Sequence, residues 1–147
     1  MGLDFDIGHE TGELMRIRLI ISILSFLLAA SLQESSASDE ETARNNLASE
    51  LVECAAYYDI AAEGIRRTGN LEGAAVSEKA AQTALEIARQ YSRDEVVLAR
   101  YKLAMEGHIK TIDGNYSNLS LLIVKYKDIC KQALETPQDR LNYWRKK

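Results

Sequence analysis

Little in this chain interrupts a helix. Residues 38–147 contain one proline and fifteen alanines, and apolar residues recur there at spacings of three and four. Alanine has the highest helix propensity of all residues, and this spacing places apolar side chains on one face of a helix. The scarcity of helix breakers therefore predicts an all-α fold.

Residues that perform chemistry are equally scarce. The sequence has no C-x-x-C or C-x-x-C-H motif, no G-x-S-x-G elbow, no S-x-x-K motif and no glycine-rich phosphate loop. These absences argue against redox dithiols, c-type haem, the common serine nucleophiles and P-loop nucleotide binding. We therefore predict that the protein is not an enzyme and needs no cofactor.

Metal and haem sites lack their usual ligands too. Residues 38–147 contain one histidine, His108, and one methionine, Met105, and both fall in the same predicted helix. Haem ligation by Met and His from different helices is therefore excluded. Di-iron bundles use Glu-x-x-His pairs, and the residue three before His108 is Met105. We predict no metal site and expect His108 to be a satisfied or exposed helix residue; a pH-sensitive contact or a lone metal ligand is the alternative.

One long hydrophobic run does occur, at residues 19–30. Two arginines precede it, and small residues follow it at residues 35–37. This order is the layout of a secretory signal peptide, and we expect cleavage between Ala37 and Ser38. The run is short for a membrane span, which needs about 20 predominantly apolar residues. An uncleaved amino-terminal anchor is the alternative.

The residues before this leader have the wrong charge for it. Residues 1–14 carry four acidic side chains ahead of the signal peptide. We interpret Met15 as the true start, residues 1–14 as a non-native upstream extension and residues 15–37 as the signal peptide; a real acidic extension is the alternative. Residues 38–147 then form a single helical-bundle domain, exported to the periplasm or the extracellular space.

Charge within the domain is nearly balanced but unevenly placed. Residues 38–147 hold 17 acidic and 16 basic residues, so no basic field favours a nucleic-acid partner. Residues 39–63 contain seven acidic residues and one basic residue, whereas residues 125–147 contain seven basic and three acidic ones. The two ends of the domain are therefore complementary in charge.

Capping and turn residues mark the expected helix ends. Ser38 and Ser92 each begin a capping box that ends in glutamate three residues later. Residues 68–70 stop the first helix, and Pro137 stands at the first position of a short last helix. The expected helices are residues 38–67, 71–91, 92–113, 117–135 and a short fifth one from residue 137.

Short connections decide how these helices are arranged. Sequential helices joined by a few residues become antiparallel neighbours. The predicted fold is therefore an antiparallel four-helix bundle with a short carboxyl-terminal fifth helix. A solenoid of helical hairpins is the competing arrangement, but the sequence shows no 34-residue self-similarity.

The two cysteines, Cys54 and Cys130, fall on the apolar faces of the first and fourth helices. At about 1.5 Å rise per residue, the two cysteines of an antiparallel pair would lie about 21 Å and about 20 Å from the same end of the bundle. An exported protein meets an oxidising environment. We predict a disulfide that joins these helices, with a free or redox-active pair as the alternative.

The same periodicity identifies the expected core faces. Tyr58 and Tyr126, each four residues from a cysteine, are expected over the sulfur bridge, either as core packing or as an aromatic pocket. The expected faces are Leu47, Leu51, Cys54, Tyr58, Ala61 and Ile65 in the first helix, and Leu119, Ile123, Tyr126, Cys130 and Ala133 in the fourth.

Three short patterns carry a resemblance. With Cys-Ala-Ala-Tyr-Tyr ending at Tyr58, Tyr126-x-x-x-Cys130 and Pro137-x-x-Arg-x-x-Tyr-Trp144, the chain resembles small exported helical proteins of bacteria that have no assigned function. It is also similar to periplasmic acid-stress chaperones, which are small, helical proteins with one disulfide. The resemblance implies a fold and a compartment, and it transfers no site.

The carboxyl-terminal tail is the predicted binding surface. Tyr143, Trp144 and Arg145 combine aromatic and basic groups, which are common anchors at interfaces and membrane surfaces. The alternative is that Leu141 and Trp144 pack onto the end of the bundle. We predict an exported, non-enzymatic helical protein that binds a protein partner or an envelope component. A periplasmic stress chaperone or small apolar-ligand carrier is one alternative, and a membrane-anchored structural protein with an uncleaved leader is another.

Overall fold

The computed structural model describes the backbone of residues 11–147 and the side chains of residues 37–147. The chain divides into two compact units, Met1–Asp39 and Glu40–Lys147, and the second holds all the sites considered below. The expectations for the extension at residues 1–14 and for the leader at residues 15–37 fall almost wholly outside the described side chains, and they stay predictions. Ala37 and Ser38, the expected cleavage residues, are both exposed.

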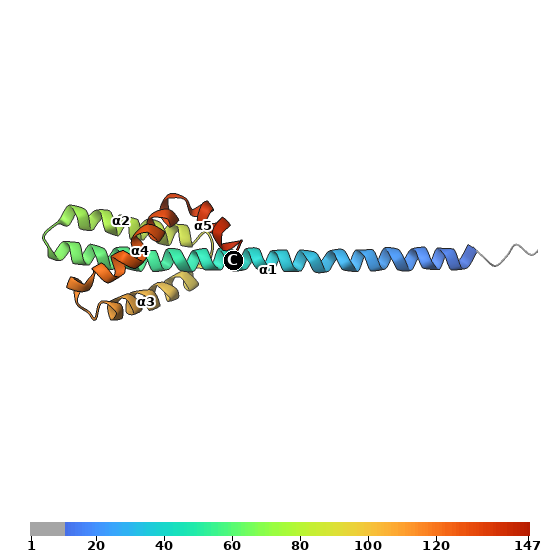
Figure 1. Ribbon diagram of the computed structural model, residues 1–147, viewed down its shortest axis with the longest axis horizontal. Helices are drawn as coiled ribbons and strands as arrows, with labels where there is room; N and C mark the ends of the chain where they lie inside the picture. The colour runs from blue at the N-terminus through green and yellow to red at the C-terminus, as the bar shows by residue number, and fades with distance from the viewer. Residues whose placement is uncertain (1–10) are drawn as a thin grey trace, which may run out of the picture. The chain divides into compact units, whose positions relative to one another are not determined.

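Helices are the only regular elements in residues 11–147, and the all-α prediction is confirmed (Figure 1). Among residues with described side chains, none of these helices is long and apolar enough to cross a membrane. The helices are α1 (Thr11–Arg67), α2 (Leu71–Ala88), α3 (Asp94–Thr111), a 3₁₀ turn η1 (Tyr116–Asn118), α4 (Ser120–Glu135) and α5 (Pro137–Trp144).

The predicted helix start at Ser38 is wrong, because α1 passes through this residue without a break. No glycine or proline occurs between Gly12 and Gly64, so nothing in the sequence stops the helix on the amino-terminal side of Ser38. The end of α1 is as predicted. Gly69 has a left-handed φ of 83°, and the side chain of Asn70 accepts a hydrogen bond from the Gly73 amide to begin α2.

The capping box at Ser92 is also wrong. Arg93 is the residue that precedes α3, and no side chain caps this helix. Asp94, in the first turn of α3, accepts a 2.6 Å hydrogen bond from Arg89 at the end of α2. The expected fourth helix likewise starts later, at Ser120, because Asn115 first caps the 3₁₀ turn through the Ser117 amide. Pro137 occupies the first turn of α5 as predicted.

The core is built around α1. Its residues from 43 to 62 are buried on several faces rather than along one stripe, so the predicted single seam is too narrow. Figure 1 shows the reason, because α2 and α3 run along opposite sides of α1 and α4 crosses it obliquely. The buried residues of α1 are Ala43, Leu47, Ala48, Leu51, Val52, Cys54, Ala55, Ala56, Tyr57, Ile60, Ala61 and Ala62.

Helix α4 packs through a face slightly rotated from the predicted one. Leu122, Cys130 and Ala133 are buried, whereas Ile123 is 38% exposed and does not belong to the core. Cys130 forms a disulfide with Cys54 of α1, across 76 residues of sequence. The prediction that these two helices are covalently joined is therefore confirmed.

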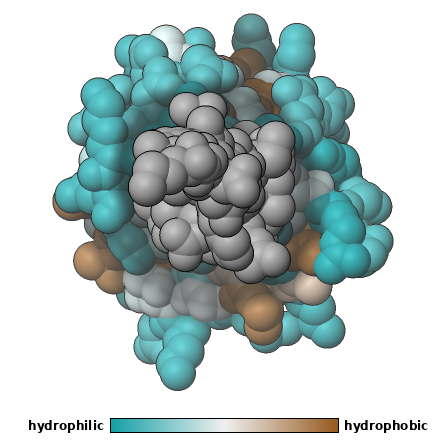
Figure 2. Space-filling model, turned by 90° about the vertical axis from the view of Figure 1, so that its right-hand side faces the viewer, coloured by the Kyte–Doolittle hydropathy of each residue, from teal (hydrophilic) through white to brown (hydrophobic). Residues whose placement is uncertain are grey.

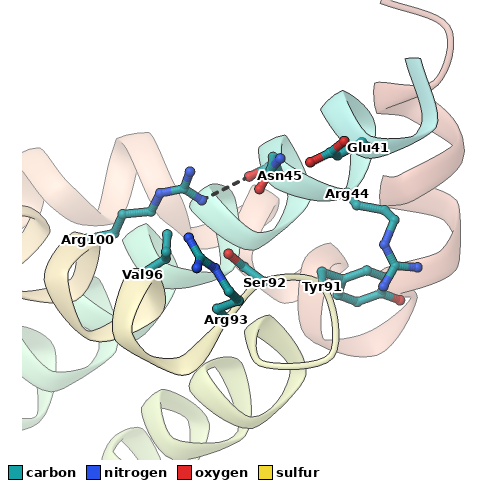
Figure 3. A pocket seen from close by; sticks show the side chains of 8 residues that line it. All are labelled: Glu41, Arg44, Asn45, Tyr91, Ser92, Arg93, Val96 and Arg100. Carbon is teal, nitrogen blue, oxygen red and sulfur yellow. Dashed lines mark hydrogen bonds between the residues drawn. The ribbon is translucent and has the colours of Figure 1, made fainter. Parts of the chain in front are cut away.

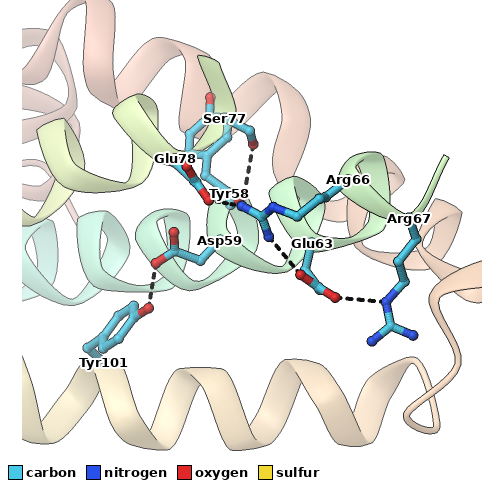
Figure 4. A network of polar contacts seen from close by, with 8 residues as sticks. All are labelled: Tyr58, Asp59, Glu63, Arg66, Arg67, Ser77, Glu78 and Tyr101. Carbon is cyan, nitrogen blue, oxygen red and sulfur yellow. Dashed lines mark hydrogen bonds and ion pairs between the residues drawn. The ribbon is translucent and has the colours of Figure 1, made fainter. Parts of the chain in front are cut away.

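Polar contacts tie α1 to its neighbours along its last turns (Figure 4). The Ser77 hydroxyl on α2 donates to the Tyr58 carbonyl over 2.8 Å, and the Tyr101 hydroxyl on α3 donates to the Asp59 carboxylate over 2.5 Å. Burial, and then the adjacent Asp59 carboxylate, raise the pKa of Tyr101. Arg66 bridges Glu63 of its own helix and Glu78 of α2. These contacts hold α2 and α3 against α1.

Candidate functional site

The disulfide borders an apolar groove of about 260 Å³ on the surface of the domain. Cys54 forms part of its floor, and Tyr126, Ile129 and Trp144 form its apolar walls. The rings of Tyr126 and Tyr57 lie 5.9 Å apart in a stacked arrangement. Tyr126 therefore lines a surface groove beside the sulfur bridge, as one of the two sequence interpretations expected.

The second predicted tyrosine lies further into the protein. The Tyr58 ring is 4.9 Å from that of Tyr57 and packs against the buried core. It does not line the groove, so only Tyr126 of the predicted pair fits the pocket interpretation. Burial raises the pKa of Tyr57, Tyr58 and Tyr126, as expected for phenols removed from water.

His108 is a buried, satisfied residue. It is 4% exposed, its Nε2 atom lies 3.1 Å from the Glu53 carbonyl oxygen and 3.3 Å from Glu53 Oε2, and its ring is 4.6 Å from Tyr126. This contact joins α3 to α1. Residues 37–147 contain no group of three or more histidine, cysteine, aspartate and glutamate side chains placed to hold a metal ion.

The carboxyl-terminal tail is fixed to the domain through its apolar side chains. Leu141 is 3% exposed, and Trp144 packs against the core. The Trp144 indole nitrogen is buried and has no hydrogen-bond partner. Tyr143 is 41% exposed, and its ring contacts the Trp144 ring edge to face. Leu141 and Trp144 therefore pack on the domain as the alternative interpretation expected, and partner binding by the tail stays a prediction.

Basic residues in α5 and directly after it meet acidic residues of α1, in agreement with the charge complementarity seen in the sequence. Arg140 donates through Nε and an Nη atom to both carboxylate oxygens of Glu50, over 2.7 and 2.5 Å. Arg145 contacts both carboxylate oxygens of Glu40 in the same way, over 2.6 and 2.8 Å. Its guanidinium group lowers the pKa of Glu40. Arg145 was a predicted partner-binding residue, and here it holds the tail to α1.

A second, polar pocket lies where the α2–α3 connection meets α1 (Figure 3). Its volume is about 490 Å³, and three arginines line it: Arg44 from α1, Arg93 before α3 and Arg100 within α3. Glu41 is the one carboxylate among the lining residues. The sequence analysis missed this site, because 56 residues separate Arg44 from Arg100 and no local motif connects them.

Comparisons with known proteins do not indicate what these sites bind. No protein-family model, no curated protein and no solved structure matches the chain. The fold and sites define a small all-helical protein in which a disulfide and two bidentate arginine–carboxylate pairs join distant parts of the sequence.

Proposed function

We propose that this is an exported, non-enzymatic helical protein that binds a protein partner or an envelope component through the displayed side of α5. The observation that carries the proposal is the setting of Tyr143. The Arg140 guanidinium carbon lies 4.4 Å from the centroid of this exposed ring, and the Lys147 ammonium nitrogen lies 5.4 Å from it.

The Tyr143 ring also packs against a residue of the core surface, Trp144. Trp144 contacts Tyr143 edge to face with centroids 5.2 Å apart, and Trp144 is itself packed on the core. A rigid aromatic side chain loses little conformational entropy when a partner covers it, and tyrosine and arginine are enriched at binding hot spots. Arg140 is already paired with Glu50, so Lys147 is the flanking cation that favours a partner with an acidic group at this surface.

The disulfide supports the part of the proposal that concerns export. Disulfides persist in oxidising compartments and are rare in the cytosol. The Cys54–Cys130 bond is therefore in keeping with the signal-peptide interpretation of residues 15–37. We propose also that residues 38–147 are arranged as an antiparallel four-helix bundle, in support of which the helices follow one another through short connections.

A test of the binding surface replaces Tyr143 without disturbing Leu141 or Trp144. We expect the Y143S variant to stay folded, since Tyr143 is 41% exposed and lies outside the core, and to recover less of the partner in a cross-linking pull-down of the exported protein. Val76 on α2 is 67% exposed and supplies the matched control, V76S. Equal recovery of the same partner by the wild type and both variants would contradict the proposal.

The groove beside the disulfide favours a second function, a carrier of a small apolar ligand. Its walls are apolar, and the buried Trp144 indole nitrogen lacks a partner. An apolar fluorescent dye should bind the wild type and lose affinity in an I129S variant, which opens the groove wall. Dye binding that is the same in both proteins would remove this candidate.

A stress chaperone and an anchored structural protein are the remaining proposals. On the face shown in Figure 2, hydrophilic side chains predominate and hydrophobic ones are scattered among them. Scattered apolar side chains are ordinary on a protein surface, so this face gives a chaperone no particular support. Mass spectrometry of the exported protein distinguishes the anchored form, because cleavage predicts an amino terminus at Ser38 and an anchor predicts an intact leader.

A further inference from the structure

We infer that the pocket formed by Arg44, Arg93 and Arg100 binds the phosphate group of a ligand. None of the tail residues Tyr143, Trp144 and Arg145 lines this pocket, and the inference goes beyond the proposed partner binding. Its volume of about 490 Å³ is in the range of small-molecule sites, which is about 300–1,000 Å³. The pocket therefore has room for a phosphate group together with part of the molecule that carries it.

Backbone carbonyls and an aromatic ring hold two of the pocket arginines in place. Arg44 donates to the Gln90 carbonyl over 2.8 Å, and its guanidinium carbon lies 5.3 Å from the centroid of the Tyr91 ring. Arg100 donates to the Asn45 carbonyl over 3.3 Å. Carbonyl groups and an aromatic face orient a guanidinium group without neutralising its charge.

Two carboxylates lie near the pocket arginines: Glu41 lines the pocket, and the pKa of Glu40 is lowered first by Arg145 and also by Arg44. Within residues 37–147, neither Arg44 nor Arg100 forms an ion pair with a carboxylate. Arg93 has one, with Glu95 at 3.6 Å, but both side chains are more than three-quarters exposed. An exposed pair of this length contributes almost nothing and leaves Arg93 free to turn toward a ligand.

Most of the N–H donors of Arg44 and Arg100 remain available for a ligand. A guanidinium group has five N–H donors, and the described contacts of Arg44 and Arg100 use one each. Figure 3 shows Arg93 and Arg100 extending toward the same space, with the Glu41 carboxylate across from them. Three guanidinium groups and one carboxylate give the pocket an excess of positive charge. Planar, forked donors with this charge suit the oxygens of a phosphate group.

The test measures phosphate binding directly by calorimetry on the oxidised, full domain. Pyrophosphate is the soluble probe, and vesicles of neutral lipid with and without an anionic phospholipid are the membrane probe. We expect binding to one of them to weaken about tenfold in R100Q and in R93Q, as the loss of one charge-assisted hydrogen bond predicts. R93Q keeps the test valid if R100Q is unstable, because the Arg93 side chain is 79% exposed.

Two further variants sharpen the result. E41Q removes the negative charge from the pocket and should strengthen phosphate binding severalfold. R67Q is the matched control, because it makes the same change of charge about 35 Å away along α1. Loss of pyrophosphate binding in the pocket variants identifies a soluble phosphorylated ligand, and loss of anionic-vesicle binding identifies a lipid headgroup. Affinities for both probes that are the same in wild type, R93Q and R67Q would overturn the inference.

Discussion

The carboxyl-terminal tail and the polar pocket hold their arginines by opposite kinds of contact. Arg140 and Arg145 each bind both oxygens of a carboxylate, on Glu50 and Glu40. Arg44 and Arg100 bind only backbone carbonyls, and Arg44 also lies over an aromatic ring. The difference indicates two roles for arginine in this protein. The tail arginines bind carboxylates within the protein, and we infer that the pocket arginines bind a ligand.

Burial sets the Arg140–Glu50 pair apart, because the side chains of the other tail pair, Arg145 and Glu40, are 38% and 40% exposed. The side chains of Arg140 and Glu50 are 12% and 11% exposed, which only a well-paired ion pair tolerates. Glu50 raises the pKa of Arg140, in keeping with a pair that stays charged. The Arg93 side chain, in the pocket, is 79% exposed. Stability should therefore depend strongly on the buried Arg140–Glu50 pair and weakly on the exposed Arg93.

The largest expected effect is loss of the disulfide, which joins α4 to the α5 side of α1. In the chain-entropy model, closing a loop of 76 residues stabilises a protein by about 4 kcal/mol. We expect the C54A/C130A variant to melt on the order of 15 °C below the wild type. A reducing agent should lower the melting temperature of the wild type by a similar amount and leave the variant unchanged. Equal melting of the oxidised and reduced wild type would show that the bond does not stabilise this side.

The next largest effect should come from breaking the buried ion pair of the tail. R140A leaves the Glu50 carboxylate partly buried without its partner, and we expect a loss of about 3 kcal/mol in urea unfolding. The double variant E50M/R140M removes both charges and should recover most of that loss. A cost of R140A below that of the pocket variant R100Q would reverse the comparison.

The pocket arginines should matter much less to folding. R100Q removes one hydrogen bond, the 3.3 Å contact with the Asn45 carbonyl, so its expected cost is about 1 kcal/mol or less. R93Q should be nearly neutral, because its one ion pair is exposed. Urea unfolding at moderate salt measures both. A large cost for R93Q would mean that the pocket arginines are structural after all.

The smallest effect is the pH dependence of the Glu40–Arg145 pair. Arg145 lowers the pKa of Glu40 below its ordinary value of 4.5, so the contribution of the pair is fully present above that value. It is lost as the pH falls through the lowered pKa of the folded protein. The wild type should therefore be slightly more stable than E40Q at neutral pH, and the difference should vanish in acid. A difference that grows as the pH falls has the wrong sign for this account.

The sequence predicted those features that depend on local pattern. Alanine content and apolar spacing identified the helices. Counting residues from the helix ends placed Cys54 and Cys130 at similar heights, and these two residues form a disulfide. It failed where a pattern has competing outcomes. Ser38 begins a capping box in isolation, but an unbroken run of helix-forming residues precedes it, so α1 continues through it.

Features that depend on several helices at once were beyond local pattern. A periodic stripe assumes one packed face, whereas α1 is enclosed by three helices and is buried on several. Ile123 was assigned to the core face of α4, and it is exposed because the oblique crossing of α4 turns Leu122 inward instead. The pocket arginines carry no signal along the chain, because only the fold brings Arg44 to Arg93 and Arg100.

The central claim is that the pocket arginines keep their charge for a phosphate group while the tail arginines do not. Nuclear magnetic resonance of the arginine Nε–H groups during a pyrophosphate titration tests this in the unmodified protein. The account predicts that the signals of Arg44, Arg93 and Arg100 shift and saturate together, while those of Arg140 and Arg145 stay in place. Shifts of equal size at all five arginines, or none at the pocket, would contradict it.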